Sequence, residues 1–328
     1  MTTSRQSTGA RATPVRALGG APIEGMAAAV LSPCTMRKTS TPTHVATLSY
    51  LEPSRQEGLE TAWLGCLASL PVAGEASSLY RGRGLQMALQ AARDAGASLF
   101  VVSAGLGLVP AGRLIPTYSL TVGHQGPDRV QTKVLEPFDA TRWWKAVSAG
   151  PFSANLVSVF DAADERPILV ALSQPYARLL AEALDALEAT QASRLRIFGA
   201  GLDRHLSARI AGQILPYDER LDTIHRGTRL DFPQRALLHF VRHGLPCGPS
   251  VEAGEHAAWV RAALSRLRPP PRPARVRLSD EEIIGRIDEP AGFGLPMGEH
   301  LRLLRREGVA CEQTRFARLF RQARASAS

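Results

Sequence analysis

The chain has 328 residues, of which 45% are hydrophobic and 21% charged, and its formal net charge is +9. This length allows a large domain with a full hydrophobic core and a small appended module. No stretch approaches the about eighteen apolar residues of a membrane span, and the amino terminus lacks the apolar core of a secretory signal. We therefore expect a cytoplasmic protein without membrane contact, and the positive charge favours, without requiring, a polyanionic partner.

Composition divides the chain into four parts. Residues 1–25 contain arginines and no apolar core, so we expect a disordered extension before the fold. Residues 26–268 are expected to form an α/β core domain. Residues 269–278 combine proline and arginine without an acid, which predicts a positively charged, polyproline-like linker. Residues 279–328 predict a small helical module, for which a winged helix is one possible form.

Short apolar runs followed by polar or glycine turns predict the strands of the core domain. The first is AAAVLSPC at 27–34, and the clearest is ASLFVVSAG at 97–105, a continuous apolar run of strand length. PILVALS at 167–173 and RLRIFGAG at 194–201 repeat the pattern, and QILPYD at 213–218 is a further candidate. Strands alternating with helices predict right-handed crossovers and a mainly parallel sheet flanked by helices.

Helical spacing of apolar residues predicts the segments that cover this sheet and those that form the last module. In the module, Ser279 is a suitable N-cap, and Glu282 completes a capping box. The expected helices cover residues 58–70, 85–95, 176–189, 233–244 and 256–268 in the core, and 279–287, 298–308 and 312–324 in the module.

Two glycine-rich turns end predicted strands and are candidate ligand sites. In SAGLG, Ser103, Gly105 and Gly107 follow the clearest strand and could cradle a phosphate or a base, although a tight structural turn explains them equally. This turn lacks the spacing of a dinucleotide-binding motif. Gly199 and Gly201 end another strand, where a helix that follows directly could bind an anion at its N-terminus.

Neither metal chemistry nor serine chemistry has a convincing motif. His239 and His243 have a spacing that can bind a metal, but they lack the HExxH pattern and a carboxylate on the same face, so a structural or surface role is expected. The cysteines stand far apart without a CxxC pair. Ser173, with Gln174 and Tyr176, is a candidate wall of the site rather than a nucleophile. No metal and no cofactor are expected.

Aromatic and basic residues supply two further candidates for nucleic-acid contact. Trp143 and Trp144 could stack on a base, or they could fill the core, which is the commoner fate of such a pair. Arginines recur at helical spacing in the last module, where they form either a solvated helix face or a helix that reads DNA. They are Arg302, Arg305, Arg306, Arg315, Arg318 and Arg321.

Four short motifs in order resemble those of a known family. They are LSPCTMRKT at 31–39, ASSLYRGRG at 76–84, VVSAGLGLVP at 101–110 and IPTYSLT at 115–121. Together they resemble the peroxide-stress, DNA-binding family and its relatives of unknown function from bacterial defence and DNA-modification islands. The resemblance covers roughly the first third to half of the chain.

This resemblance implies an architecture similar to that of the uracil-DNA glycosylase superfamily, with a base-sized pocket at the strand ends. Asp128 would be the catalytic acid, Tyr118 would stack on the base, and backbone amides near Gly105 would donate to the leaving base, with Ser103 as a further catalytic candidate. The chain lacks the GQDPY-like and HPSP-like motifs of authentic uracil-DNA glycosylases. The remaining residues that the resemblance places at the pocket are Cys34, Thr35, Arg37, Lys38, Tyr80, Gly82, Gly105, Gly107 and Thr121.

Three functions follow from these patterns. The first is a DNA glycosylase-like hydrolase that recognises a modified base, in phage defence or DNA modification. The second is a DNA-binding stress-response protein that uses the same pocket without chemistry. The third is a hydrolase or transferase acting on a free nucleotide or nucleoside, for which Arg37, Lys38 and the 199–201 turn would bind phosphate. DNA is the expected partner under the first two.

Overall fold

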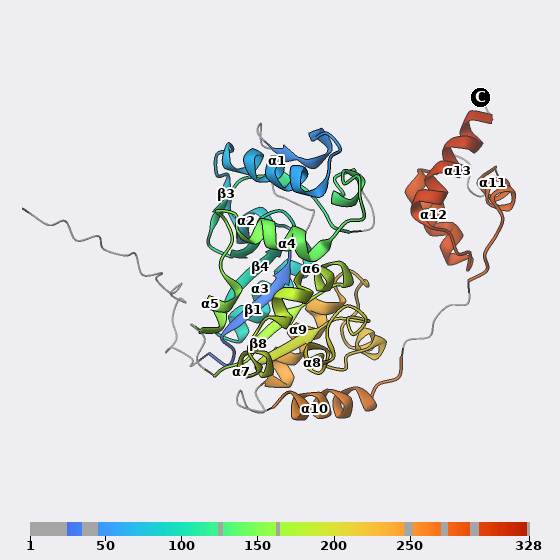
Figure 1. The fold of residues 1–328 in the computed structure, drawn as a ribbon. Coiled ribbons are helices and arrows are strands. Elements are labelled where there is room, and N and C mark those ends of the chain that lie inside the picture. Colours follow the sequence, from blue (N-terminus) through green and yellow to red (C-terminus); the bar gives the residue numbers. More distant parts are fainter. Residues whose placement is uncertain are drawn as a thin grey trace, which may run out of the picture. The chain divides into compact units, whose positions relative to one another are not determined.

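The computed structural model describes residues 25–34, 45–123, 127–161, 165–245, 252–269, 275–288 and 295–326. The chain divides into two compact units, Met1–Pro269 and Pro270–Ser328, each with a hydrophobic core among its described residues (Figure 1). The division falls inside the predicted linker, of which residues 270–274 lie outside the described ranges. So does the predicted extension, apart from Gly25. No helix in the described ranges is long and apolar enough to cross a membrane.

A mainly parallel sheet forms the centre of the first unit. Among the described residues it has five strands, in the order β5-β4-β1-β8-β9, and only the β4–β5 pair is antiparallel. Every residue of β1, β8 and β9 is buried, which explains why their sequences are apolar apart from Ser32 and Arg196. The expected α/β fold is therefore confirmed. The strands are β1 (Ala29–Pro33), β4 (Ser98–Ser103), β5 (Gly107–Pro110), β8 (Ile168–Ala171) and β9 (Leu195–Phe198).

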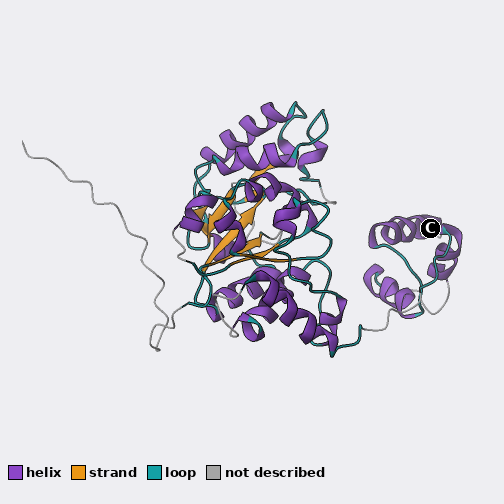
Figure 2. Ribbon diagram, turned by 60° about the horizontal axis from the view of Figure 1, so that its bottom comes forward, coloured by secondary structure: helices purple, strands orange, loops and turns teal. Residues whose placement is uncertain are grey.

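Helices cover both faces of this sheet (Figures 1 and 2). Helix α3 (Arg83–Asp94) leads into β4 and packs on β1 and β4, and α9 (Phe232–His243) packs against α3, β8 and β9. Helix α6 (Gln174–Asp185) joins β8 to β9 and packs against α4 (Ala140–Ser148). The path from β1 to β4 and the path from β8 to β9 run in opposite directions along the sheet. Right-handed crossovers therefore place α3 and α6 on opposite faces.

The remaining elements of the first unit are shorter or lie at its periphery. Strands β2 and β7 pair in parallel, and β3 and β6 pair antiparallel. The helices are α1 (Gln56–Ala68), α2 (Ala76–Leu79), α5 (Leu156–Asp161), α7 (Ala189–Ser193), α8 (Ala208–Ala211) and α10 (Ala253–Ser265). The small strands are β2 (Ala46–Thr47), β3 (Gly74–Glu75), β6 (Leu114–Ile115) and β7 (Tyr118–Ser119), and 3-10 turns cover Leu48–Tyr50, Val130–Thr132 and Glu219–Thr223.

The SAGLG turn leads into β5 as an antiparallel hairpin. Two local expectations differ from the structure. The candidate strand at 213–218 is reduced to one bridge between Ile214 and Ile197, because Pro216 has no N–H to continue the ladder. No helix follows Gly201 directly, since α8 begins only at Ala208. The backbone φ of Gly201 is +66°, which is incompatible with continuing into a right-handed helix.

The second unit contains three helices among its described residues, as expected: α11 (Asp280–Asp288), α12 (Met297–Arg306) and α13 (Gln313–Ser326). The capping box is present, because the N–H of Glu282 donates to Ser279 Oγ at 3.1 Å and the N–H of Ser279 donates to Glu282 Oε2 at 2.6 Å. Val276, from the predicted linker, bridges to Val309 and so belongs to this unit. No β-hairpin that would form a wing occurs in its described ranges.

Several arginines of the second unit are engaged in ion pairs within the unit. Arg315 and Arg318 both pair with Asp280, at 2.6 and 2.5 Å. Arg286 pairs with Glu307 at 3.1 Å. These contacts neutralise part of the positive charge of the arginines in this unit. They favour the interpretation of these arginines as a solvated helix face over that of a helix that reads DNA.

Two aromatic features of the first unit belong to its core. Trp143 and Trp144 are both buried, and the indole N–H of Trp143 donates to the carbonyl of Ala104 at 2.7 Å. His239 is also buried, bonded to Tyr217 at 2.9 Å, with the ring of His243 beside it. The structural role expected for the helix α9 histidine is thus consistent with its contacts.

We expect the free energy of unfolding to fall as the pH is lowered from 7 to 5. Burial, then the nearby His243 and His225, lower the pKa of His239 from 6.5 to about 4. As the pH falls, His239 binds a proton in the unfolded chain before it does so in the folded protein. The contribution of His239 to the free energy of unfolding is therefore fully present above pH 6.5 and is lost progressively below it. After allowance for solvent screening, the loss is about 1 to 2 kcal/mol. Urea unfolding at both pH values measures it.

The variant His239→Gln provides the control, because glutamine does not titrate and its carbonyl can accept the hydrogen bond from Tyr217. Its stability should depend less on pH over the same interval. An unchanged pH dependence would show that His239 is not the group responsible.

Candidate functional site

The strand order reverses between β1 and β8, which makes the carboxyl ends of these strands the expected place for a ligand site. Cys34 is the first residue after β1, and Tyr176 is the third residue of α6, the helix that follows β8. The Sγ of Cys34 lies 3.1 Å from the hydroxyl of Tyr176. The cysteine that follows the first strand and the wall residue predicted after β8 therefore meet at this switch point.

Hydroxyl groups from other elements join this contact. The Tyr118 hydroxyl lies 2.5 Å from Ser103 Oγ and 2.7 Å from the Tyr80 hydroxyl, and it reaches Cys34 Sγ at 3.8 Å. We call Cys34, Tyr80, Ser103, Tyr118 and Tyr176 the tyrosine–cysteine cluster. Of the predicted site residues, the structure brings together Cys34, Tyr80, Ser103 and Tyr118.

The hairpin turn after β4 fixes the serine of this cluster. Ser103 is the last residue of β4, and its Oγ accepts the backbone N–H groups of Gly105 and Leu106 at 3.2 and 3.0 Å. A Cβ at Gly105 would lie 2.8 Å from the Tyr118 ring and 3.0 Å from Trp63. Glycine at this position therefore lets the chain's own tyrosine approach the backbone.

Gly107 has the same kind of structural explanation. Its φ is +80°, and a Cβ there would lie 2.4 Å from the Oγ of Ser153. The space beside both glycines of the SAGLG turn is thus filled by side chains of this chain. The turn supports the cluster and does not offer its backbone as an open cradle.

The three tyrosines of the cluster are polar and uncharged at neutral pH. Burial is the main cause that raises the pKa values of Tyr80, Tyr118 and Tyr176 above that of an exposed tyrosine, and the neighbouring Cys34 raises them further. The three phenols therefore stay protonated. They can exchange hydrogen bonds with a neutral polar ligand but are poorly suited to accept a proton as general bases.

A small pocket of about 190 Å³ lies at the start of α6, where Pro175, the residue before Tyr176 of the cluster, forms part of its wall. Gln131 contributes a buried Oε1 atom that has no hydrogen-bond partner, while its Nε2 donates to the carbonyl of Val122 at 3.2 Å. Phe138 contributes an aromatic ring and Arg178 an exposed cation. The lining residues are Val122, Gln131, Phe138, Ala140, Pro175 and Arg178.

No sequence pattern indicated this pocket. Gln131 and Phe138 lie in an irregular segment without apolar periodicity, and only tertiary packing brings that segment against α6. The one useful signal is Tyr176, which the sequence analysis places at the candidate site together with Ser173. Tyr176 follows Pro175, and Pro175 lines the pocket.

Asp128, the predicted acid, is held in a different environment. It is 7% exposed, and its two carboxylate oxygens accept the N–H of Ser49 at 3.0 Å and the hydroxyl of Ser119 at 2.6 Å. Ser119 follows Tyr118 on β7, and neighbouring side chains of a strand point to opposite faces. Asp128 therefore lies on the face of β7 opposite the cluster. There its two hydrogen bonds connect β7 to the 3-10 turn at Leu48–Tyr50.

The other residues predicted from the resemblance have varied positions. Gly82 is the N-cap of α3, two residues after Tyr80. Thr121 forms an isolated bridge to the loop that carries Asp128, so it supports that loop. Thr35, Arg37 and Lys38 lie outside the described residues.

The turns after β8 and β9 pack on each other. A Cβ at Gly199 would lie 2.2 Å from the carbonyl of Leu172, and one at Gly201 would lie 2.8 Å from Gln174 Nε2. Close packing therefore requires glycine at position 199, whereas Gly201 is explained by its positive φ of +66°, since the Gln174 side chain could move aside. Since no helix follows Gly201 directly, the expected anion site at a helix N-terminus is wrong. Ser173 is the N-cap of α6 and makes no side-chain capping bond there.

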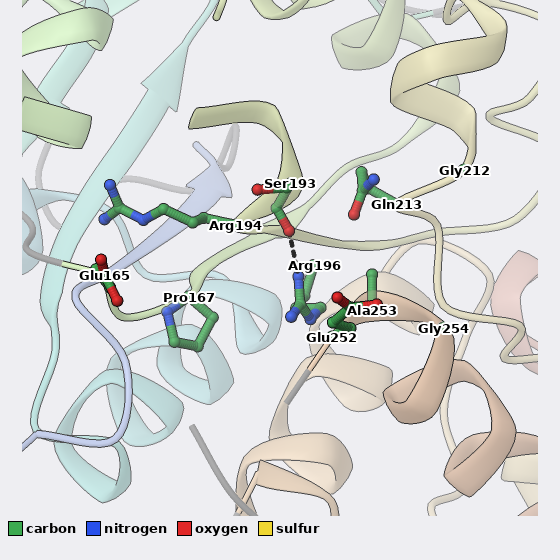
Figure 3. A pocket seen from close by; sticks show the side chains of 10 residues that line it. All are labelled: Glu165, Pro167, Ser193, Arg194, Arg196, Gly212, Gln213, Glu252, Ala253 and Gly254. Carbon is green, nitrogen blue, oxygen red and sulfur yellow. Dashed lines mark hydrogen bonds between the residues drawn. The ribbon is translucent and has the colours of Figure 1, made fainter. Parts of the chain in front are cut away.

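A larger hollow of about 380 Å³ lies at the opposite edge of the sheet, where β8 and β9 begin (Figure 3). Arg196, 3% exposed, donates to His256 Nδ1 at 2.8 Å and to the carbonyl of Ser193 at 2.9 Å. Burial lowers the pKa of Arg196 to about 10, so its guanidinium is still charged at neutral pH. Open parallel sheets bind ligands at the carboxyl edge, so the smaller pocket is the stronger candidate. The hollow's lining residues are Glu165, Pro167, Ser193, Arg194, Arg196, Gly212, Gln213, Glu252, Ala253 and Gly254.

Comparisons with known proteins give no further guidance. No family model, curated protein or solved structure matches this chain. The resemblance to the peroxide-stress family therefore rests on the four sequence motifs and stays a prediction. Within the described ranges, no group of three or more histidine, cysteine, aspartate or glutamate side chains is placed to hold a metal ion.

The geometry of Asp128 leads to a prediction that separates a structural role from a catalytic one. Asp128→Ala should lower the free energy of unfolding by about 2 kcal/mol, because two buried donors lose their acceptor. Asp128→Asn should keep most of the stability, since its amide oxygen can accept from Ser49 and its amide nitrogen can donate to Ser119. Urea unfolding of both variants measures this. Equal stability of Asp128→Ala and the wild type would contradict the fastening role.

Proposed function

We propose that this protein binds DNA and holds one unstacked base in the pocket beside the tyrosine–cysteine cluster. The observation that carries the proposal is the side chain of Gln131, which lines a small pocket with Phe138 and Arg178 and whose buried Oε1 atom has no hydrogen-bond partner. This pocket is at the carboxyl edge of the sheet, next to the switch point between β1 and β8.

The three groups correspond to the three needs of base recognition. Aromatic side chains stack on an unstacked base, and hydrogen bonds read its edge. In the proposed complex Phe138 provides the ring, and Gln131 Oε1 accepts an N–H or amino group of the base. Arg178 binds the adjoining phosphate. A volume of about 190 Å³ is below the roughly 300 Å³ at which pockets for drug-sized ligands begin, so one ring system is the appropriate occupant.

Binding without bond cleavage is better supported than glycosidic hydrolysis. Hydrolysis needs a carboxylate near the reacting sugar to orient or deprotonate water. The cluster supplies hydroxyls and a thiol, and the carboxylate of Asp128 is engaged by Ser49 and Ser119. The non-catalytic DNA-binding alternative therefore takes precedence over a DNA glycosylase-like activity. Action on a free nucleotide loses support because the predicted phosphate site at Gly199 and Gly201 lacks its helix.

The proposal predicts that Gln131→Leu binds DNA about tenfold more weakly than the wild type, as expected for the loss of one buried hydrogen bond. The dependence of affinity on salt concentration should not change, because no cation is removed. Fluorescence anisotropy with short single-stranded and duplex DNA at several salt concentrations measures both. Gln213→Leu is the matched control, since it also removes a buried, unpartnered glutamine carbonyl, but from the hollow at the opposite edge.

Absence of salt-dependent DNA binding by the wild type would refute the proposal. Equal loss of affinity in Gln131→Leu and Gln213→Leu would remove the assignment of the base to this pocket. The same mixtures are analysed for released bases and alkali-labile abasic sites, using normal, uracil-containing and hypermodified phage DNA. Release by the wild type, abolished in Asp128→Asn, would establish a glycosylase in place of a binding protein.

A further inference from the structure

The hollow at the amino edge of the sheet contains a polar atom that the fold leaves unsatisfied. The Oε1 atom of Gln213 is buried and has no hydrogen-bond partner. In Figure 3 this oxygen points across the hollow, toward Arg196 and Ala253. A buried carbonyl oxygen without a donor destabilises a fold, so it calls for an explanation. A ligand with an N–H group in the hollow would supply the missing donor.

Backbone bonds fix the position of this oxygen. The N–H of Gln213 donates to the carbonyl of Ile210 at 3.0 Å, and its carbonyl accepts the N–H of Ile197 at 2.9 Å. Ile197 is a buried residue of β9. Gln213 is therefore attached directly to an edge strand of the sheet, which holds its side chain at the wall of the hollow.

A buried positive charge forms another part of the wall. Arg196 is 3% exposed and lines the hollow. Burial lowers the pKa of Arg196 to about 10, and the carboxylate of Glu252 opposes this decrease, so the guanidinium is charged at neutral pH. It donates to His256 Nδ1 at 2.8 Å and to the carbonyls of Ser193 and Leu195 at 2.9 and 2.8 Å. These three acceptors are neutral, so they fix the guanidinium without cancelling its charge.

The start of α10 adds to the positive potential beside Arg196. Ala253 and Gly254 are the first two residues of this helix, and both line the hollow. The first N–H groups of a helix have no partner within it and carry the positive end of its dipole. A Cβ at Gly254 would meet no heavy atom within 4 Å, so this turn is open. One side of the hollow therefore attracts an anionic group.

Carboxylates give the same hollow negative charge. Glu165 and Glu252 both line it, and both are exposed. They disfavour a ligand that is entirely anionic, such as inorganic phosphate, whereas Arg196 disfavours one that is entirely cationic. A ligand with both charges avoids both repulsions. N–H donors at its cationic end would also satisfy Gln213.

We propose that the hollow binds a small zwitterion of the class of free α-amino acids. The ammonium group donates to Gln213 Oε1 and faces Glu252, while the carboxylate faces Arg196 and the first N–H groups of α10. The volume of about 380 Å³ lies in the range of small-molecule pockets, so the side chain of the amino acid is accommodated as well. This site is separate from the base pocket, and its ligand binding requires no DNA.

The test begins with the melting temperature of the full chain in the presence of each common L-amino acid in turn. At least one should raise it, because a ligand that binds only the folded chain stabilises that chain. Isothermal titration calorimetry then compares this amino acid with its amide, which lacks the carboxylate, and with its N-acetyl derivative, which lacks the ammonium group. Each should bind at least about tenfold more weakly, because each loses one charged contact.

The variant Gln213→Leu places the ligand in the hollow. It should bind the amino acid about tenfold more weakly than the wild type, as expected for the loss of one buried hydrogen bond. It should unfold at the same urea concentration as the wild type or at a higher one, because the substitution removes an unsatisfied acceptor. Gln131→Leu, which removes the equivalent atom from the base pocket, is the matched control and should bind the amino acid as the wild type does.

The outcomes separate this inference from the proposed function. If no amino acid binds, or if the N-acetyl derivative or inorganic phosphate binds as tightly as the amino acid, the zwitterion site is refuted and the base pocket is unaffected. Equal affinity of Gln213→Leu and the wild type for the amino acid would also refute it. If the wild type binds the amino acid in a Gln213-dependent way but does not bind DNA, the proposed function fails and this inference stands.

Discussion

The reversal of strand order between β1 and β8 is the constraint on which the rest of the site depends. Right-handed crossovers send α3 to one face of the sheet and α6 to the other, so the two chain paths separate at these strands. Cys34 and Tyr176 meet across the resulting gap at 3.1 Å. Tyr118 extends this contact to Ser103, so the end of β4 is tied to the same point.

The two edges of the sheet bury different kinds of polar group. At the amino edge Arg196 carries a full charge and bonds to His256, so its polar atoms serve the fold. At the carboxyl edge the three phenols and the Ser103 hydroxyl of the cluster are neutral. Neutral groups cost less to bury than charges, and they can exchange partners with a ligand without leaving an uncompensated charge behind. This difference favours recognition of a neutral ligand at the carboxyl edge.

Sequence patterns predicted the sheet because its strands are mainly apolar runs, and they located Ser103 because it ends the clearest of these runs. Cys34 and Tyr118 were predicted from the resemblance of four short motifs to a known family. The patterns could not show that the space at Gly105 and Gly107 is filled, since Trp63, Tyr118 and Ser153 arrive there from distant segments. The pocket escaped prediction for the same reason. Long-range packing of irregular chain has no local periodicity, and a glycine that admits a ligand looks identical to one that admits a side chain.

Elements from both faces of the sheet meet at its carboxyl edge. The pocket is built on α4 and α6, whereas the residues 224–231 that precede α9 are fastened to α3 and α9, on the other face of the sheet. Between them lie the ends of β1 and β8, where Cys34 meets Tyr176. The buried Arg235 donates to the carbonyls of His225 and Thr228 and so fixes this border of the edge. A ligand that extends beyond the pocket would therefore meet a surface whose position the fold has already set, because the sheet determines the separation of its two layers.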